Sequence, residues 1–110
     1  GTNLANCINS GSEWSGKQTA PVGSFQANPF GLYDTVGNLW EWCADPSHSN
    51  YQGAPTDGRI WDSSDTVMRL LRGGSFIYGP KYCRAAFRIW LSSVNRFRSR
   101  GFRGCADLAL

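Results

Sequence analysis

The fold of this chain is decided by one stretch, Leu71-Arg-Gly-Gly-Ser-Phe-Ile-Tyr-Gly-Pro-Lys-Tyr-Cys-Arg-Ala-Ala-Phe-Arg88. Asn95-Arg96 and the closing Gly101-Phe-Arg103 follow it. Glycine, arginine and small residues recur along the stretch, and aromatic and aliphatic side chains fill the gaps between them. Aromatic and arginine side chains dominate the energetics of binding interfaces. The pattern therefore indicates a recognition surface rather than a catalytic centre.

The composition predicts one turn-rich domain. At 110 residues the chain is long enough for one modest core and too short for two. Hydrophobic residues make up 41%, aromatic residues 14%, and 13 residues are glycine, which favours many turns and few long helices. We therefore expect residues 1–110 to form a single domain, and the start at Gly1 without methionine suggests the C-terminal part of a larger protein.

The charge is mildly positive and unevenly distributed. The formal net charge is +3, and nine of the eleven basic residues lie between Arg69 and Arg103. Arginine beside tryptophan or phenylalanine is as often a stacking or ion-pairing group as a contact to nucleic acid. A protein ligand is therefore favoured over nucleic acid. No apolar run approaches the length of a membrane span, so membrane insertion is not expected, and the cytoplasm and the cell surface both remain open.

Four cysteines are too few for a fold built on disulfides. Cys7, Cys43, Cys83 and Cys105 form no Cys-x-x-Cys pair, which argues against zinc. Two disulfides are possible by count, with three connectivities, but buried free thiols are the default. The only histidine, His48, has no cysteine near it and is expected to be solvated rather than catalytic.

The expected architecture is α+β, with short, mostly antiparallel strands and extensive loops. Alternating or dense apolar residues predict strands over Thr19–Phe25, Asn38–Trp42, Val67–Leu71 and Gly101–Leu108. Residues 45–65 are polar and hold two prolines and two glycines, which is typical of a long surface loop. Gly73-Gly74 should end the preceding strand where the backbone bends.

Five motifs stand in order along the chain: Asn28-Pro-Phe-Gly-Leu-Tyr-Asp34, Gly37-Asn-Leu-Trp-Glu-Trp42, Leu71-Arg-Gly-Gly-Ser-Phe76, Cys83-Arg-Ala-Ala-Phe-Arg88 and Gly101-Phe-Arg103. In that order they resemble the formylglycine-generating (sulfatase-modifying factor) domain family. The resemblance extends from about Thr19 to Arg103 and corresponds to the C-terminal part of the full enzymes. It implies a C-type lectin-like fold.

Enzymes of that family use a cysteine pair, placed shortly after the Gly-Gly-Ser-aromatic motif, to bind copper and oxidise a substrate cysteine. At the position of the first cysteine this chain has Tyr78, and the second position falls in a segment that this chain lacks. Tyrosine cannot supply the thiolate that this copper chemistry requires. Cys83 lies later, where the family has a structural residue. Because this chain lacks the cysteine pair of the family, we expect that it is not an enzyme, and no catalytic residue is assigned.

The same frame resembles more closely the variable proteins of diversity-generating retroelements, which occur in prokaryotes and phages. Their C-type lectin-like domain carries a hypervariable C-terminal segment, which corresponds here to about residues 71–103. The resemblance implies ligand-binding, diversified positions at Ile77, Tyr78, Gly79, Tyr82, Phe87, Ile89, Leu91, Phe97, Arg98 and Ser99.

In those proteins the variable segment corresponds to a template copy rich in AAC codons, and mutagenesis changes the adenines of these codons. The ten positions agree with such an origin. Each of the ten residues can be reached from AAC by changing adenines alone, a route that cannot produce Lys, Glu, Gln, Met or Trp. Trp90 is added to the predicted surface for its large aromatic area. The alternative that these side chains belong to the core stays open for Phe87 and Ile89, which flank Arg88 in a strand-like alternation.

The resemblance also implies a structural calcium site, formed by the side chains of Asp34 and Glu41 with the carbonyls of Gly37 and Leu39. Calcium prefers several oxygen ligands, which this segment offers. The alternative is that Asp34 caps a turn and that Glu41 pairs with an arginine such as Arg72 or Arg88.

The remaining aromatic and arginine residues of the motifs are expected to be structural. Trp40, Trp42 and Phe102 should pack in the core. Four arginines should brace the binding loops through backbone carbonyls or carboxylates, namely Arg72, Arg84, Arg88 and Arg103. The predicted function is recognition without chemistry, and the alternative is a formylglycine-generating oxidase or an inactive relative of it. Calcium-dependent carbohydrate binding is suggested only by the name of the fold.

Overall fold

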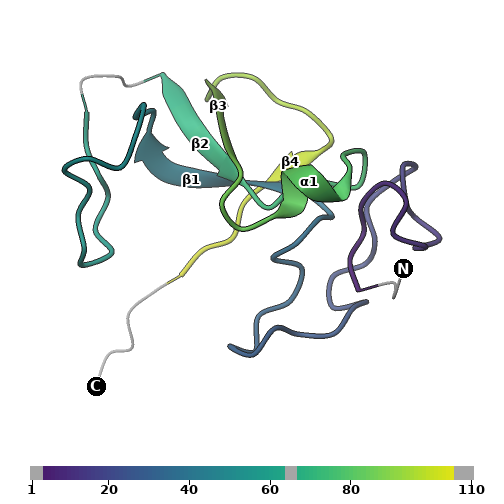
Figure 1. The fold of residues 1–110 in the computed structure, drawn as a ribbon. Coiled ribbons are helices and arrows are strands. Elements are labelled where there is room, and N and C mark those ends of the chain that lie inside the picture. The colour runs from purple at the N-terminus through teal and green to yellow at the C-terminus, as the bar shows by residue number, and fades with distance from the viewer. Residues whose placement is uncertain (1–3, 64–66, 106–110) are drawn as a thin grey trace.

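The protein is described by a computed structural model that covers residues 4–63 and 67–105. The elements follow the order β1 (Trp40–Pro46), β2 (Met68–Arg72), α1 (Pro80–Cys83), β3 (Arg88–Ser92) and β4 (Arg100–Gly101). The other described residues form turns and loops (Figure 1). The observed architecture thus has the short strands and extensive loops that the sequence predicts.

Within the described residues the strands form a four-stranded, curled sheet in the order β3-β2-β1-β4 (Figure 1). β2 pairs antiparallel with both β1 and β3, and Leu71 of β2 lies opposite Trp42 and Ile89. β4 instead joins β1 in parallel, with Trp40 opposite Arg100. Parallel neighbouring strands require a long connection, and the chain between β1 and β4 contains β2, α1 and β3.

The core lies where β1, β2 and the Gly-Gly turn meet. Trp40, Leu71 and Phe76 are at most 1% exposed. Gly73 and Gly74 have φ angles of 95° and 74°, a region that favours glycine, and this turn lets Phe76 pack back toward the sheet. Burial of side chains of this size stabilises the fold by about 2 kcal/mol each.

Asn38, at the entrance to β1, joins the N-terminal loops to this core. Its N–H donates to the Asn6 carbonyl at 2.7 Å, and its own carbonyl accepts from the Phe76 N–H at 2.9 Å. Its side-chain oxygen accepts from the Ala20 N–H at 2.8 Å and from the Asn6 amide at 3.2 Å. Asn6 and Asn38 are both buried, so these bonds replace the hydrogen bonds to water that the amides lose on folding.

The same bonds explain why the strand predicted over Thr19–Phe25 is wrong. The N–H and the carbonyl of Ala20 both bond to the Asn38 side chain, at 2.8 and 3.3 Å, so that no partner strand is needed. Ala20 is buried, but Val22 is 89% exposed and the segment forms turns.

The C-terminal strand is also shorter than predicted. Only Arg100–Gly101 pairs as β4, residues 102–105 are loop, and residues 106–108 of the prediction lie outside the described residues. Phe102 is 84% exposed because it follows the last paired residue, so the expectation that it packs in the core is wrong. Trp40 is buried as expected, and Trp42 is half-buried beneath the Arg100 guanidinium.

The loop between β1 and β2 begins after Pro46, slightly later than predicted. His48 is half-buried there rather than fully solvated: its ring stacks on Trp61 at 3.6 Å between ring centroids, and its Nε2 lies 2.9 Å from the Trp61 carbonyl oxygen. The Trp61 N–H in turn donates to Asp45 at 3.0 Å, which holds the loop against the end of β1. Over residues 4–63 and 67–105, no helix has the length and apolar character of a membrane span.

Candidate functional site

Four aromatic side chains from separate parts of the chain form one cluster. Trp40 comes from β1, Tyr78 from the loop before α1, Tyr82 from α1, and Phe87 from the residue before β3. Ring centroids are 5.4 Å apart for Trp40–Tyr78, 5.3 Å for Tyr78–Tyr82 and 5.0 Å for Tyr82–Phe87, and each pair meets edge to face. Such pairs contribute about 0.5–1.5 kcal/mol beyond their buried area. Three predicted binding positions, Tyr78, Tyr82 and Phe87, thus pack in one cluster with the core residue Trp40.

The predicted binding positions differ in exposure. The most exposed side chains, each open to solvent by about a third or more, are those of Ile77, Tyr78, Trp90, Phe97 and Arg98. Half-buried residues are Gly79, Tyr82, Phe87, Ile89 and Leu91. Packing is therefore part of the role of Phe87 and Ile89, the two positions for which a core location was the alternative. We use the name recognition surface for the five exposed residues.

Ser99 lies apart from this recognition surface. It is 7% exposed, and its carbonyl accepts a hydrogen bond from the Trp40 N–H at 2.8 Å, where the chain enters β4. A residue held against β1 in this way has little surface to offer a ligand. The structure therefore does not support Ser99 as a displayed position.

Arg72 connects the segment after α1 to the loop between β1 and β2. Its two terminal nitrogens donate to the Ala85 carbonyl at 2.6 Å and to the Tyr51 hydroxyl at 2.7 Å. The Tyr51 ring also lies beneath the Arg88 guanidinium, 4.5 Å from its centroid, while Arg88 donates to the Ser49 carbonyl at 3.3 Å. Two arginines thus hold this loop beside β3.

Tyr51 is a surface residue that the sequence analysis missed. It is 57% exposed, and the Arg88 guanidinium that covers its ring also lies 5.6 Å from the Trp90 ring. Tyr51 therefore extends the recognition surface beyond the C-terminal segment. The only sequence signal was an aromatic residue in an otherwise polar loop.

Arginines also lie over the other aromatic rings of the C-terminal segment. The guanidinium of Arg100 is 4.1 Å from the Phe97 ring centroid, and that of Arg98 is 5.5 Å from the Phe76 ring. Arg84 lies 5.6 Å from the Phe87 ring. The predicted bracing of the binding loops through a carbonyl holds for Arg72, which contacts Ala85. Arg88 and Arg103 bond to carbonyl or carboxylate oxygens outside those loops, and Arg84 contacts an aromatic ring instead.

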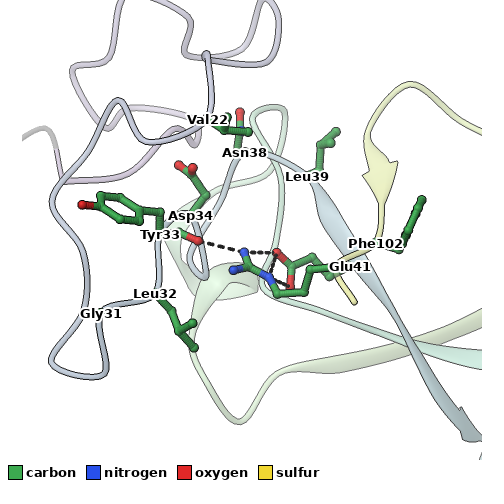
Figure 2. Close-up of a pocket in the computed structure, with 10 residues that line it drawn as sticks. Val22, Gly31, Leu32, Tyr33, Asp34, Asn38, Leu39, Glu41 and Phe102 are labelled. Carbon is green, nitrogen blue, oxygen red and sulfur yellow. Dashed lines mark hydrogen bonds and ion pairs between the residues drawn. The ribbon is translucent and has the colours of Figure 1, made fainter. Parts of the chain in front are cut away.

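Arg103 bridges β1 and the loop that precedes it, through Glu41 and Tyr33, which Figure 2 labels. Its Nε lies 2.9 Å from both Glu41 carboxylate oxygens, and one terminal nitrogen donates to the Tyr33 carbonyl at 2.8 Å. Hydrogen bonding to Glu41 raises the pKa of Arg103 above its ordinary value. These residues line a cavity of about 410 Å³ whose other walls include Leu32 and Phe102.

This arrangement bears directly on the predicted calcium ligands. Glu41 pairs with an arginine, as the alternative proposed, but the partner is Arg103 rather than Arg72 or Arg88. Asp34 accepts a hydrogen bond from the Gly23 N–H at 2.9 Å.

The Arg103 guanidinium contacts both oxygens of Glu41, one of the two carboxylates of the predicted calcium site. Within the described residues, acidic, histidine and cysteine side chains do not gather in groups of three or more that could hold a metal, but the predicted site takes two of its four ligands from backbone carbonyls. The calcium site formed with the carbonyls of Gly37 and Leu39 stays a prediction, and we derive no function from it.

Comparison with known proteins places the chain in a family. A family model described as the sulfatase-modifying factor enzyme 1-like domain matches residues 1–108. The chain belongs to this family. The formylglycine-generating enzyme of Thermomonospora curvata is 35% identical over 95 residues, which span 81% of this chain and 31% of that enzyme.

Two solved structures resemble the fold of this sulfatase-modifying-factor-like chain. PvdO from Pseudomonas aeruginosa superposes with a TM-score of 0.80 at 34% identity, over 91% of this chain and 38% of that one. Treponema denticola variable protein 1 gives a TM-score of 0.66 at 30% identity, over 81% of this chain and 34% of that one. The predicted C-type lectin-like fold is thereby confirmed. The chain spans about a third of the length of each of these relatives.

Proposed function

We propose that this chain binds a protein ligand through its recognition surface and does not catalyse the oxidation of cysteine. The observation that carries the proposal is the position of Tyr78, where the family resemblance places the first copper-binding cysteine. Its ring packs edge-on against Trp40 and Tyr82. A phenol in this packing provides no thiolate for copper.

The character of the recognition surface supports a protein ligand. Tyr78, Trp90 and Phe97 expose aromatic area, and Arg98 and Arg88 supply positive charge beside them. Tryptophan, tyrosine and arginine are the residues most often found at the energetic centres of protein interfaces. Because Arg72 and Arg88 fix the neighbouring backbone, little conformational entropy would be lost on binding.

An assay for oxidation separates this proposal from an oxidase. The chain would be incubated with copper, oxygen, a thiol reductant and a cysteine-containing peptide, with the Thermomonospora curvata enzyme as positive control. We expect no formylglycine by mass spectrometry. Formylglycine formed by this chain, and lost in Cys83→Ser, would show that the proposal is wrong and that the oxidase alternative is right.

A more specific candidate function is that of a variable protein of a diversity-generating retroelement. The similarity to Treponema denticola variable protein 1 favours it, as does the agreement of ten positions with AAC codons. The test is the DNA sequence around the gene. A near-copy of the codons for residues 71–103 beside a reverse-transcriptase gene, differing mainly at adenines, is the expected result. If no such copy exists, the surface is a fixed interface rather than a diversified one.

A further inference from the structure

Two cysteines that are distant in the sequence meet inside the fold. Cys7 lies in the N-terminal loop and Cys83 is the last residue of α1, 76 positions later. Both are buried, at 5% and 4% exposure. Both side chains line one cavity, and the proximity of the Cys7 thiol contributes to the raised pKa of the Cys83 thiol. The aromatic cluster and the Glu41–Arg103 pair do not include either residue.

The backbone around the two thiols is fixed on both sides. The Ile8 N–H donates to the Tyr78 carbonyl at 2.9 Å, which ties the N-terminal loop to the segment before α1. Cys83 lies against Gly74 so closely that a Cβ on Gly74 would be 2.4 Å from the Cys83 sulfur. The Cys83 thiol also donates to the Gly79 carbonyl at 3.7 Å. These contacts tie the N-terminal loop to the segment before α1 and place Cys83 against the Gly-Gly turn.

A small molecule can reach these thiols from one side. Cys7 and Cys83 both line a cavity of about 430 Å³, whose walls are mainly apolar and include Leu4, Val36 and Pro80. This volume lies in the range of small-molecule sites. It leaves room for one half of a low-molecular-weight disulfide beside the cysteines.

The reduced pair is poorly reactive on its own. Burial, and next the neighbouring Cys7 thiol, raise the pKa of Cys83 from 9.0 to about 11. Because the thiolate is the nucleophile, a thiol with this pKa reacts slowly at neutral pH. Slow formation of a disulfide fits this environment better than rapid thiol exchange.

We propose that Cys7 and Cys83 form a reversible intramolecular disulfide, with a low-molecular-weight disulfide such as oxidised glutathione as the oxidant. One cysteine loses its proton and attacks the oxidant, which releases one glutathione thiol and leaves a mixed disulfide. The second cysteine loses its proton and attacks that mixed disulfide, which releases the second glutathione thiol. The two cysteine sulfurs are oxidised and one glutathione disulfide is reduced to two thiols.

The crosslink would fasten the N-terminal loop to α1, the element that carries Tyr82 and follows Tyr78. Oxidation would then stabilise the backbone beneath the aromatic cluster without changing any exposed side chain. The inference concerns the fold around Cys7 and Cys83 and does not depend on the proposed function.

The test uses the 110-residue chain with Cys43→Ser and Cys105→Ser, so that only the pair remains. This protein is treated with oxidised glutathione in the folded state and, separately, refolded from denaturant in a glutathione redox buffer. We expect a mass loss of two hydrogens, a linked Cys7–Cys83 peptide, and a thermal midpoint raised by roughly 10 °C and restored by reductant. In the refolding experiment the thiols start exposed, so the disulfide can form even if the buried thiols of the folded protein react slowly.

The matched control is the same protein with the added change Cys7→Ser, in which oxidised glutathione should leave the thermal midpoint unchanged. Two results would overturn the proposal. One is the absence of a linked peptide after both treatments, and the other is a glutathione adduct that persists on either cysteine instead of resolving to the internal disulfide.

Discussion

At the scale of single residues, Gly74 tests how closely the Gly-Gly turn approaches α1. An alanine Cβ there would lie 2.4 Å from the Cys83 sulfur and 3.0 Å from its Cα, at a φ of 74°. Gly74→Ala should lower the free energy of unfolding by about 3 kcal/mol or more, because steric overlap is added to left-handed strain. Gly58→Ala is the matched control, since Gly58 has a φ of 81° with open space around it. It should cost about 1 kcal/mol in the same denaturant titration, and equal losses at both positions would contradict the packing described here.

Arg103 is the second residue whose role can be measured singly. Arg103→Lys keeps the charge but loses the paired contact to Glu41 and the bond to the Tyr33 carbonyl. The side chains of Arg103 and Glu41 are 40% and 25% exposed, so solvent screens the pair and the loss should be only about 0.5–1 kcal/mol. Arg96→Lys, at an exposed arginine, should leave denaturant stability unchanged. A similar loss in both variants would argue against a specific role for Arg103.

The partner of the Glu41 carboxylate could not be predicted from the sequence. The family resemblance implied that Glu41 binds calcium, and the nearby arginines of the motifs offered an ion pair as the alternative. The choice of Arg103, 62 residues away, depends on the parallel pairing of β4 beside β1. No local pattern encodes that pairing, because it follows from the path of the whole chain.

At the scale of elements, strands with an apolar alternation were predictable and irregular segments were not. The prediction over 67–71 covers β2 except for its last residue, whereas the prediction over 38–42 covers only the start of β1, which continues to Pro46. The strand expected at Thr19–Phe25 failed because the Asn38 side chain, rather than a second strand, satisfies Ala20. The helix α1 is only one turn long, too short for any periodic signal, although Pro80 stands at its first turn as is common for helices.

The loop after β1 offers a test of how arginines position an element. Tyr51→Phe removes the hydroxyl that Arg72 contacts and keeps the ring beneath Arg88. We expect faster amide hydrogen exchange and proteolysis in residues 47–61, with a stability loss of about 0.5–1.5 kcal/mol. Tyr33→Phe, at another half-exposed tyrosine, serves as control and should change neither. Unchanged exchange in Tyr51→Phe would mean that ring stacking alone holds the loop.

At the scale of the whole molecule, stability should depend on pH through its buried thiols. The folded-state pKa of Cys83 is raised from 9.0 to about 11 by burial and by Cys7, and burial also raises the pKa of Cys43. The fold therefore favours the neutral thiol over the thiolate. For Cys83 this contribution is complete below pH 9 and is lost as the pH rises from 9 through about 11.

Comparison with Cys83→Ala separates this effect from the titration of other groups. Under reducing conditions the wild-type chain should be the more stable of the two at pH 8, and its advantage should shrink by about 1–2 kcal/mol as the pH approaches 11. Cys105 is exposed, so Cys105→Ser should track the wild-type chain at every pH. The measurement is urea denaturation followed by tryptophan fluorescence between pH 7 and 11. A constant difference between wild type and Cys83→Ala would show that Cys83 keeps an ordinary pKa, and would place its sulfur in contact with water rather than with Cys7 and Gly74.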